Sequence, residues 1–191
     1  MSSFFAITLT LFFVIDALGN IPTYLHLLKP YDKGKKIRIA LRELCIALVI
    51  MIVFHYVGQA LLTALAISPT TVRVAAGIVL FLIAIRLIFS DDDLPKWKEH
   101  EPFIVPLATP IIAGPSVLAI IMIFAKDEHS GLILGAICLS WFLSSILFLF
   151  AQPIYNLIKD KGLNACQRLM GLIVALIAVQ FFLEGVVGAI K

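Results

Sequence analysis

Charged residues are scarce in this chain of 191 residues. Asp, Glu, Lys and Arg make up 14% of it, where about 25% is usual in globular proteins. Four long stretches contain none of them, namely residues 1–15, 44–72, 102–125 and 129–158. The longest polar stretch covers only residues 91–101. This scarcity excludes a soluble catalytic domain, a disordered chain, a coiled coil and a nucleic-acid-binding protein as the main interpretation.

Motifs of catalytic and nucleotide chemistry are also missing. The three cysteines, Cys45, Cys138 and Cys166, form no CxxC motif and no cluster with histidine, so we interpret them as packing residues. The sequence has no HExxH, no GxSxG and no phosphate-binding glycine loop, which are the signatures of several enzyme classes. We therefore expect no metal site, no cofactor and no enzyme activity.

Apolar residues, by contrast, reach 61% and gather in six long runs. A bilayer core takes about 20 apolar residues per helix, and continuous rather than alternating runs favour helices over a barrel. We therefore predict an all-α polytopic membrane protein with six transmembrane helices in a lipid bilayer. The predicted spans cover residues 3–28, 43–65, 70–89, 103–125, 132–154 and 167–190. Glu43, Arg86 and Glu184 lie near span ends, and we interpret them as interfacial anchors.

Lys and Arg are unevenly distributed along the chain. Six of them lie between residues 29 and 42, directly after the first span. With this loop in the cytoplasm, alternation through six spans puts twelve of the fifteen basic residues on the cytoplasmic side. That asymmetry is the one the positive-inside rule describes. Both termini are then expected to face the periplasm.

The third and sixth predicted spans are similar to each other. Residues 77–86 align with residues 171–180 at an offset of 94, with Gly77 opposite Gly171 and Ala84 opposite Ala178. The first and fourth spans match at nearly the same offset, because Gly19 and Gly114 lie 95 residues apart. Two matches in one register predict duplication of a three-span unit, covering residues 1–95 and 96–191. Since three is odd, the second copy must be inverted in the membrane.

The first and fourth spans each carry helix breakers in the middle. The two segments read Asp16-Ala-Leu-Gly-Asn-Ile-Pro22 and Pro110-Ile-Ile-Ala-Gly-Pro-Ser116. We expect Asn20 to cap a second half-helix with Pro22 in its first turn, and Gly19 to adopt the backbone angles of the break. In the fourth span, Pro110, Gly114 and Pro115 are expected to do the same. Half-helix N-termini suit a carboxylate, and exposed carbonyls suit an ammonium group or a cation.

These two segments resemble the signature segments of the MarC family of bacterial inner-membrane proteins. The resemblance covers the whole chain in length, number of spans and order of segments. The family usually has proline where this chain has Ala17, and glycine where it has Ser116. The family is also described as transporting small neutral amino acids, so the resemblance implies transport of glycine or alanine across the bacterial inner membrane. It also implies coupling to H⁺ or Na⁺.

The candidate substrate-binding residues lie at the two breaks: Asp16, Gly19, Asn20, Thr109, Gly114 and Ser116. Asp16 is the one acid far from both ends of its span, and an intramembrane carboxylate is a functional candidate by default. We therefore expect Asp16 to exchange the coupling ion; the alternative is a protonated Asp16 that only caps the break. For His55, a hydrogen bond between helices is favoured over a proton relay.

Two other functions compete with a secondary transporter. A passive pore, or an exporter of an unidentified solute, also fits a small six-span protein, although a pore does not need inverted broken helices. An intramembrane enzyme is less favoured, since known intramembrane chemistry uses paired acids, a Ser/His set or a metal site. Accelerated exchange of labelled solute would distinguish a transporter from a pore.

Overall fold

The computed structural model describes residues 4–89, 112–127 and 129–190. These residues form helices and contain no strand, which confirms the all-α prediction for the described part of the chain. The helices are α1 (Phe4–Ile15), α2 (Ile21–Leu28), α3 (Lys33–Ala64), α4 (Pro69–Ile88), α5 (Pro115–Asp127), α6 (Ser130–Leu149) and α7 (Ala151–Ile190).

Among the described residues, three helical segments are long and apolar enough to cross a membrane: α4, α6 and the part of α7 from Lys161 to Ile190. Two shorter apolar helices, α1 and residues 116–125 of α5, accompany them. The predicted second span, residues 43–65, covers the apolar part of α3, which begins earlier, at Lys33, and also includes the basic residues before that span. The early part of the predicted fourth span lies outside the described residues.

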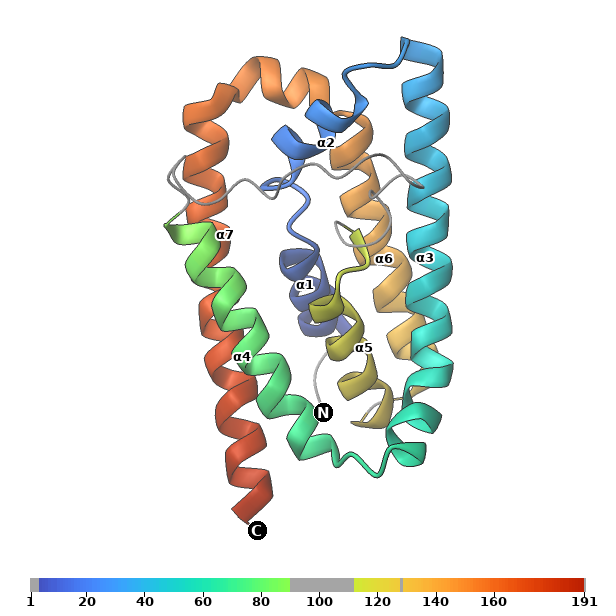
Figure 1. The fold of residues 1–191 in the computed structure, drawn as a ribbon, viewed down its shortest axis with the longest axis vertical. Coiled ribbons are helices and arrows are strands. Elements are labelled where there is room, and N and C mark those ends of the chain that lie inside the picture. Colours follow the sequence, from blue (N-terminus) through green and yellow to red (C-terminus); the bar gives the residue numbers. More distant parts are fainter. Residues whose placement is uncertain (1–3, 90–111, 128, 191) are drawn as a thin grey trace.

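The interrupted helices occupy the middle of the bundle (Figure 1). α1 and α5 lie between the α4–α7 pair on one side and α3 with α6 on the other, and the contacts agree: α1 packs on α6, α5 packs on α3, and α4 packs on α7. We name the two ends of the bundle for later use. The terminal end is where α1 begins and α7 ends, and the basic end is where α2 meets α3 and α7 begins.

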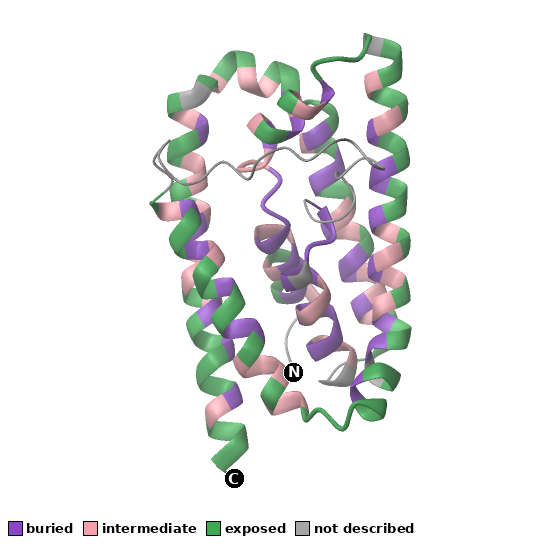
Figure 2. Cartoon of the chain, in the orientation of Figure 1, coloured by how far each residue is buried: buried purple, intermediate pink, exposed green. Residues whose placement is uncertain are grey.

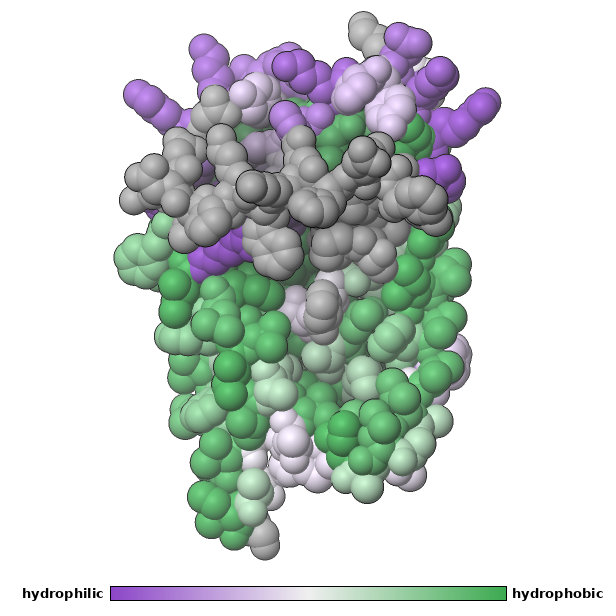
Figure 3. All heavy atoms as spheres, viewed as in Figure 1, coloured by the Kyte–Doolittle hydropathy of each residue, from purple (hydrophilic) through white to green (hydrophobic). Residues whose placement is uncertain are grey.

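Burial and hydropathy follow this layout. Buried residues concentrate on α1, α5 and the inward faces of the outer helices (Figure 2). The outward faces expose many large apolar side chains, among them Val49, Leu82, Leu157 and Leu176. Figure 3 shows this apolar surface below a hydrophilic rim at the basic end. An apolar surface of this extent fits lipid rather than water.

α4 and α7 pack as an antiparallel pair through small residues. A β-carbon at Gly77 would lie 2.7 Å from the backbone nitrogen of Phe182 and 2.9 Å from the carbonyl oxygen of Ala178. At the other end of the contact, a β-carbon at Gly171 would lie 3.2 Å from the carbonyl oxygen of Ala84. Glycine at these positions lets the two backbones approach closely, as small residues do in membrane helix pairs.

α7 changes direction near its start. Lys159 has φ 56° and ψ −179°, which is non-helical, so α7 consists of two helices joined at a corner. The first of them runs across the basic end of the bundle (Figure 1). The predicted boundaries of the fifth and sixth spans, at residues 154 and 167, were therefore wrong by several residues. α6 already ends at Leu149, and the apolar part of α7 begins at Lys161.

Candidate functional site at the helix breaks

The break in the first span lies where the sequence predicts it. α1 ends at Ile15, residues 16–20 form turns, and α2 begins at Ile21 with Pro22 in its first turn. The backbone of the break differs from the prediction. Asp16, rather than Gly19, has the left-handed conformation, with φ 46°, and no described glycine has a positive φ. Aspartate is one of the few residues with a side chain that adopt this conformation.

Gly19 is needed for space rather than for its backbone angles. Its backbone nitrogen donates a hydrogen bond to Oδ1 of Asp16 at 3.2 Å. A β-carbon at Gly19 would collide with the carboxylate of Asp16. The side chain of Asp16 is therefore folded back over the turn, and Asp16 is only 7% exposed. Glycine at position 19 allows a carboxylate to be buried at this depth.

Asn20 lies at the predicted N-cap position of α2, but its side chain makes no cap hydrogen bond. Its Nδ2 instead donates to the carbonyl oxygen of Asp16 at 3.0 Å and to that of Ile15 at 3.3 Å. The predicted capping role was therefore wrong. The side-chain amide of Asn20 donates to carbonyls at the C-terminal end of α1, and carbonyls at a helix end have no partner within the helix. The N–H groups at the N-terminus of α2 are therefore not capped by Asn20.

The second break precedes α5. The chain is non-helical at Ala113 and Gly114, and α5 begins at Pro115. Gly114 is buried, and its carbonyl oxygen accepts the amide of Leu118 at 3.1 Å. Ser116 is 5% exposed in the first turn of α5. Two of the predicted site residues, Thr109 and Pro110, lie outside the described residues, as does the side chain of Pro115.

Both breaks lie in the interior of the bundle, and each is followed by a new helix. α1 and α5 contact each other, and Figure 1 shows α2 toward the basic end, beyond the first break, and α5 running from the second break toward the terminal end. Helix N-termini carry partial positive charge and unpaired N–H groups. The arrangement thus presents two positive helix ends and a buried carboxylate at Asp16.

Sequence reasoning missed several buried polar groups on α3 and α6. The hydroxyls of Ser144 and Ser145 are buried on α6, which packs on α1, and have no hydrogen-bond partner among the described residues. Glu43 was predicted to be an interfacial anchor; it is 3% exposed and pairs with Arg42 at 2.8 Å. Periodicity of apolar residues is the signal that identifies an inward helix face. These helices are only weakly amphipathic, so that signal is hidden in this sequence.

His55 behaves as the sequence predicts. Its Nε2 lies 2.6 Å from Oγ of Ser130, so it joins α3 to the start of α6. A second link between the same helices is the hydrogen bond from Nε1 of Trp141 to the carbonyl oxygen of Leu44, at 2.8 Å. These contacts assign His55 and Trp141 to helix packing.

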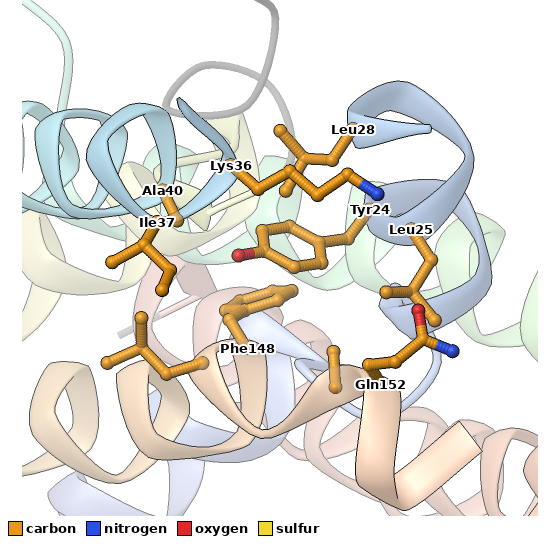
Figure 4. Close-up of a pocket in the computed structure, with 10 residues that line it drawn as sticks. Tyr24, Leu25, Leu28, Lys36, Ile37, Ala40, Phe148 and Gln152 are labelled. Atoms are coloured by element: carbon orange, nitrogen blue, oxygen red, sulfur yellow. The ribbon is translucent and has the colours of Figure 1, made fainter. Parts of the chain in front are cut away.

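A cavity of about 270 Å³ lies at the basic end, beyond α2 (Figure 4). Tyr24 and Phe148 form one wall, with their ring centroids 5.0 Å apart, and Lys36 reaches across the ring of Tyr24. A second cavity, of about 370 Å³, lies between α1, α4, α5 and α7. Neither is lined by residues of the breaks: the first lies at the basic end of the bundle and the second toward the terminal end.

Comparison with known proteins identifies the family. The family described as MarC family integral membrane protein matches residues 1–190. The chain belongs to the MarC family. It is therefore an integral membrane protein, as the composition and the apolar surface indicate.

Relatives are similar over nearly the whole chain. A UPF0056 membrane protein of Buchnera aphidicola subsp. Schizaphis graminum is 39% identical over 190 residues, which is 97% of each chain. The UPF0056 inner membrane protein YhgN of Escherichia coli K12 is 37% identical over 193 residues, again 97% of each chain. A UPF0056 membrane protein of Methanocaldococcus jannaschii is 32% identical over 94% of this chain and 84% of its own. No solved structure matches the chain.

Proposed function

We propose that this MarC family protein is a secondary transporter of small neutral amino acids, which bind between the two helix breaks. The observation that carries the proposal is the buried carboxylate of Asp16 at an interrupted helix, in contact with the backbone of the interruption. A charge at bilayer depth is costly and usually serves an ion or a substrate.

The chemistry of the breaks suits an amino-acid zwitterion. The N-termini of α2 and α5 favour the carboxylate of the substrate, and the side-chain amide of Asn20 does not occupy the N-terminus of α2. The carboxylate of Asp16 favours the ammonium group or a coupling cation. The buried hydroxyls of Ser116, Ser144 and Ser145 add polar groups of small size. A small, crowded site of this kind favours glycine or alanine over larger amino acids.

The packing of α4 on α7 supports the inverted repeat. Gly77 faces Ala178, and Gly171 faces Ala84. In the alignment of the two halves, Gly77 corresponds to Gly171 and Ala84 to Ala178. Exchanging the halves therefore turns one contact into the other, as a two-fold axis between antiparallel helices requires. Secondary transporters with repeats of this kind bind substrate at the repeat interface.

The basic end is assigned to the cytoplasm by the positive-inside rule. The termini then face the periplasm, with one cavity at the cytoplasmic end of the bundle and the other toward the periplasmic end. Since the Escherichia coli relative is named an inner membrane protein, we assign this chain to the bacterial inner membrane. Either H⁺ or Na⁺ is the coupling ion. A pore or an exporter of another solute is the alternative, and an intramembrane enzyme is the least favoured one.

Counterflow in proteoliposomes tests the proposal. Vesicles loaded with unlabelled alanine should take up labelled alanine faster than empty vesicles, because a carrier exchanges its substrate whereas a pore does not. Purified protein should also gain thermal stability with glycine or alanine, since a ligand of the folded state stabilises it. Equal uptake by loaded and empty vesicles would contradict a carrier.

A variant of the second break separates binding from folding. Gly114 is buried directly before α5, so Gly114→Leu should fill the space at the helix N-terminus and abolish both counterflow and substrate-induced stabilisation. The matched control is Leu82→Ala on the lipid-facing side of α4, where the side chain is 62% exposed. Unchanged stabilisation by alanine in Gly114→Leu would remove Gly114 from the site.

A further inference from the structure

The larger cavity, of about 370 Å³, lies at the terminal end of the bundle, away from the breaks. It is bordered by α1, α4, α5 and α7. Its polar lining consists of Thr10, Arg73, Gln180 and Glu184. Its apolar lining includes Ile123, Phe124 and Phe181, with the last two rings 5.9 Å apart.

Two opposite charges face each other in this cavity. Nη1 of Arg73 lies 3.7 Å from Oε2 of Glu184, which is an ion-pair distance but longer than a hydrogen bond. The other carboxylate oxygen of Glu184 accepts a hydrogen bond from Nε2 of Gln180 at 2.6 Å. Gln180 thus fixes the orientation of Glu184, and the side chains of Arg73 and Glu184 keep 26% and 43% of their surface exposed.

We infer that this cavity is a second binding site for a small zwitterion, in which Arg73 binds the carboxylate and Glu184 the ammonium group. The inference rests on the proposed function, because it makes the cavity an outer site through which the amino acid reaches the breaks. A guanidinium carries N–H donors in a planar fork that matches a carboxylate. The cavity of about 370 Å³ beside this ion pair has the room for a ligand with both charges.

The lining also sets the class of ligand. One positive and one negative side chain match a molecule that carries one charge of each sign, whereas an acidic or basic amino acid brings a third charge without a partner. The apolar wall formed by Phe124 and Phe181 accepts a hydrogen atom or a methyl group. The outer site therefore favours small neutral amino acids.

The cavity and the first break lie along the same helix, α1. Thr10 lines the cavity, and its Oγ1 donates to the carbonyl oxygen of Ala6 at 2.8 Å. Asp16 lies six residues further along the chain, which corresponds to about 9 Å of helix. The outer site and Asp16 are therefore both placed along α1, with the outer site nearer the terminal end.

Protection of an introduced thiol tests the outer site directly. In a variant with Ser at positions 45, 138 and 166, Thr10→Cys places one thiol in the cavity wall. Alanine should slow its alkylation by N-ethylmaleimide, whereas propionate and ethylamine, each with one of the two charges, should protect much less. Arg73→Gln and, separately, Glu184→Gln should raise the alanine concentration that gives half-maximal protection about tenfold or more. A loss of affinity of this size corresponds to the loss of one hydrogen bond to a charged group.

Arg86→Gln is the matched control, because Arg86 lies near the other end of the same helix and does not line the cavity. Its protection by alanine should equal that of the parent protein. Melting temperature and gel filtration of each variant show that it is folded. In Arg73→Lys, which keeps the positive charge but not the planar guanidinium, alanine should protect the thiol to an intermediate extent.

Three results would overturn the outer site. Unchanged protection in folded Arg73→Gln and Glu184→Gln would make the pair structural, while counterflow by the parent protein would leave the proposed function in place. Protection by glycerophosphoethanolamine but not by alanine would assign the cavity to a lipid headgroup. Absence of counterflow, stabilisation and protection with all twenty amino acids would overturn both the outer site and the proposed function.

Discussion

Gly19 and Asp16 are in such close contact that no side chain fits between them. The backbone nitrogen of Gly19 donates to the Asp16 carboxylate, and a β-carbon at Gly19 would overlap that carboxylate. Asp16 itself holds the left-handed backbone of the break. The glycine and the aspartate are therefore one structural unit, and a change in either moves the other.

Gly19→Ala should displace the Asp16 carboxylate and destabilise the protein by about 1–3 kcal/mol, as overpacking does. Substrate-induced stabilisation should be lost with it. Shortening Asp16 in the double variant Gly19→Ala, Asp16→Ser should restore the melting temperature but not the binding of alanine. Gly34→Ala is the control: a β-carbon there meets nothing within 4 Å, so stability should not fall. A normal melting temperature and normal binding in Gly19→Ala would show that the turn adapts.

The position of this break was predictable from the sequence, but its construction was not. Breakers within an apolar run show that a helix must end, because proline and glycine act through the local backbone. Which residue takes the left-handed conformation depends on contacts across the turn. The side chain of Asn20 could cap the helix ahead or bond to the helix behind, and the sequence does not distinguish these two choices.

The contact between α4 and α7 offers a second test. Gly77→Ala should destabilise the protein by about 1–3 kcal/mol, because the new β-carbon would press on the backbone of α7 at Ala178 and Phe182. Gly171→Ala should have a similar effect, since it faces Ala84 and Leu87 in the reciprocal contact. Thermal unfolding in detergent measures both. Gly131→Ala, whose β-carbon would meet nothing within 4 Å, is the control; equal melting temperatures in all three variants would contradict close packing.

The relation between α4 and α7 is visible in the sequence, because residues 77–86 and 171–180 are similar. Sequence spacing alone could not predict that Glu43 is buried or that Arg73 and Glu184 form a pair. Both depend on which face of a helix turns inward, and α3, α4 and α7 are apolar on nearly all sides. In such helices the inward face is chosen by small residues and by buried polar contacts, which form only when the partner helix is present.

Orientation in the membrane is a third prediction, and it follows from the distribution of basic residues. In a chain without its native cysteines, Ile190→Cys should react with a membrane-impermeant thiol reagent in intact spheroplasts, and Lys35→Cys should react only after lysis. Ile190 is 81% exposed at the end of α7, and Lys35 is exposed at the basic end. The reverse pattern of labelling would place the termini in the cytoplasm.

The coupling role of Asp16 is the fourth prediction. Asn has nearly the same shape as Asp and tolerates a positive φ, so Asp16→Asn should keep the turn and an oxygen that accepts the amide of Gly19. It removes the negative charge that would bind H⁺ or Na⁺. Exchange of alanine between the two sides of the membrane should therefore continue, whereas accumulation driven by a pH or Na⁺ gradient should disappear.

Uptake into proteoliposomes with an imposed pH or Na⁺ gradient separates a coupling carboxylate from a capping one. Asp32→Asn provides the same chemical change at the N-cap of α3, where the side chain is exposed and makes no cap hydrogen bond, and it should accumulate alanine as the parent protein does. If Asp16 only caps the break, Asp16→Asn should also accumulate alanine and differ in stability alone. Gradient-driven accumulation in that variant would therefore assign the coupling ion to another group, because no charge would then remain at position 16 to carry it.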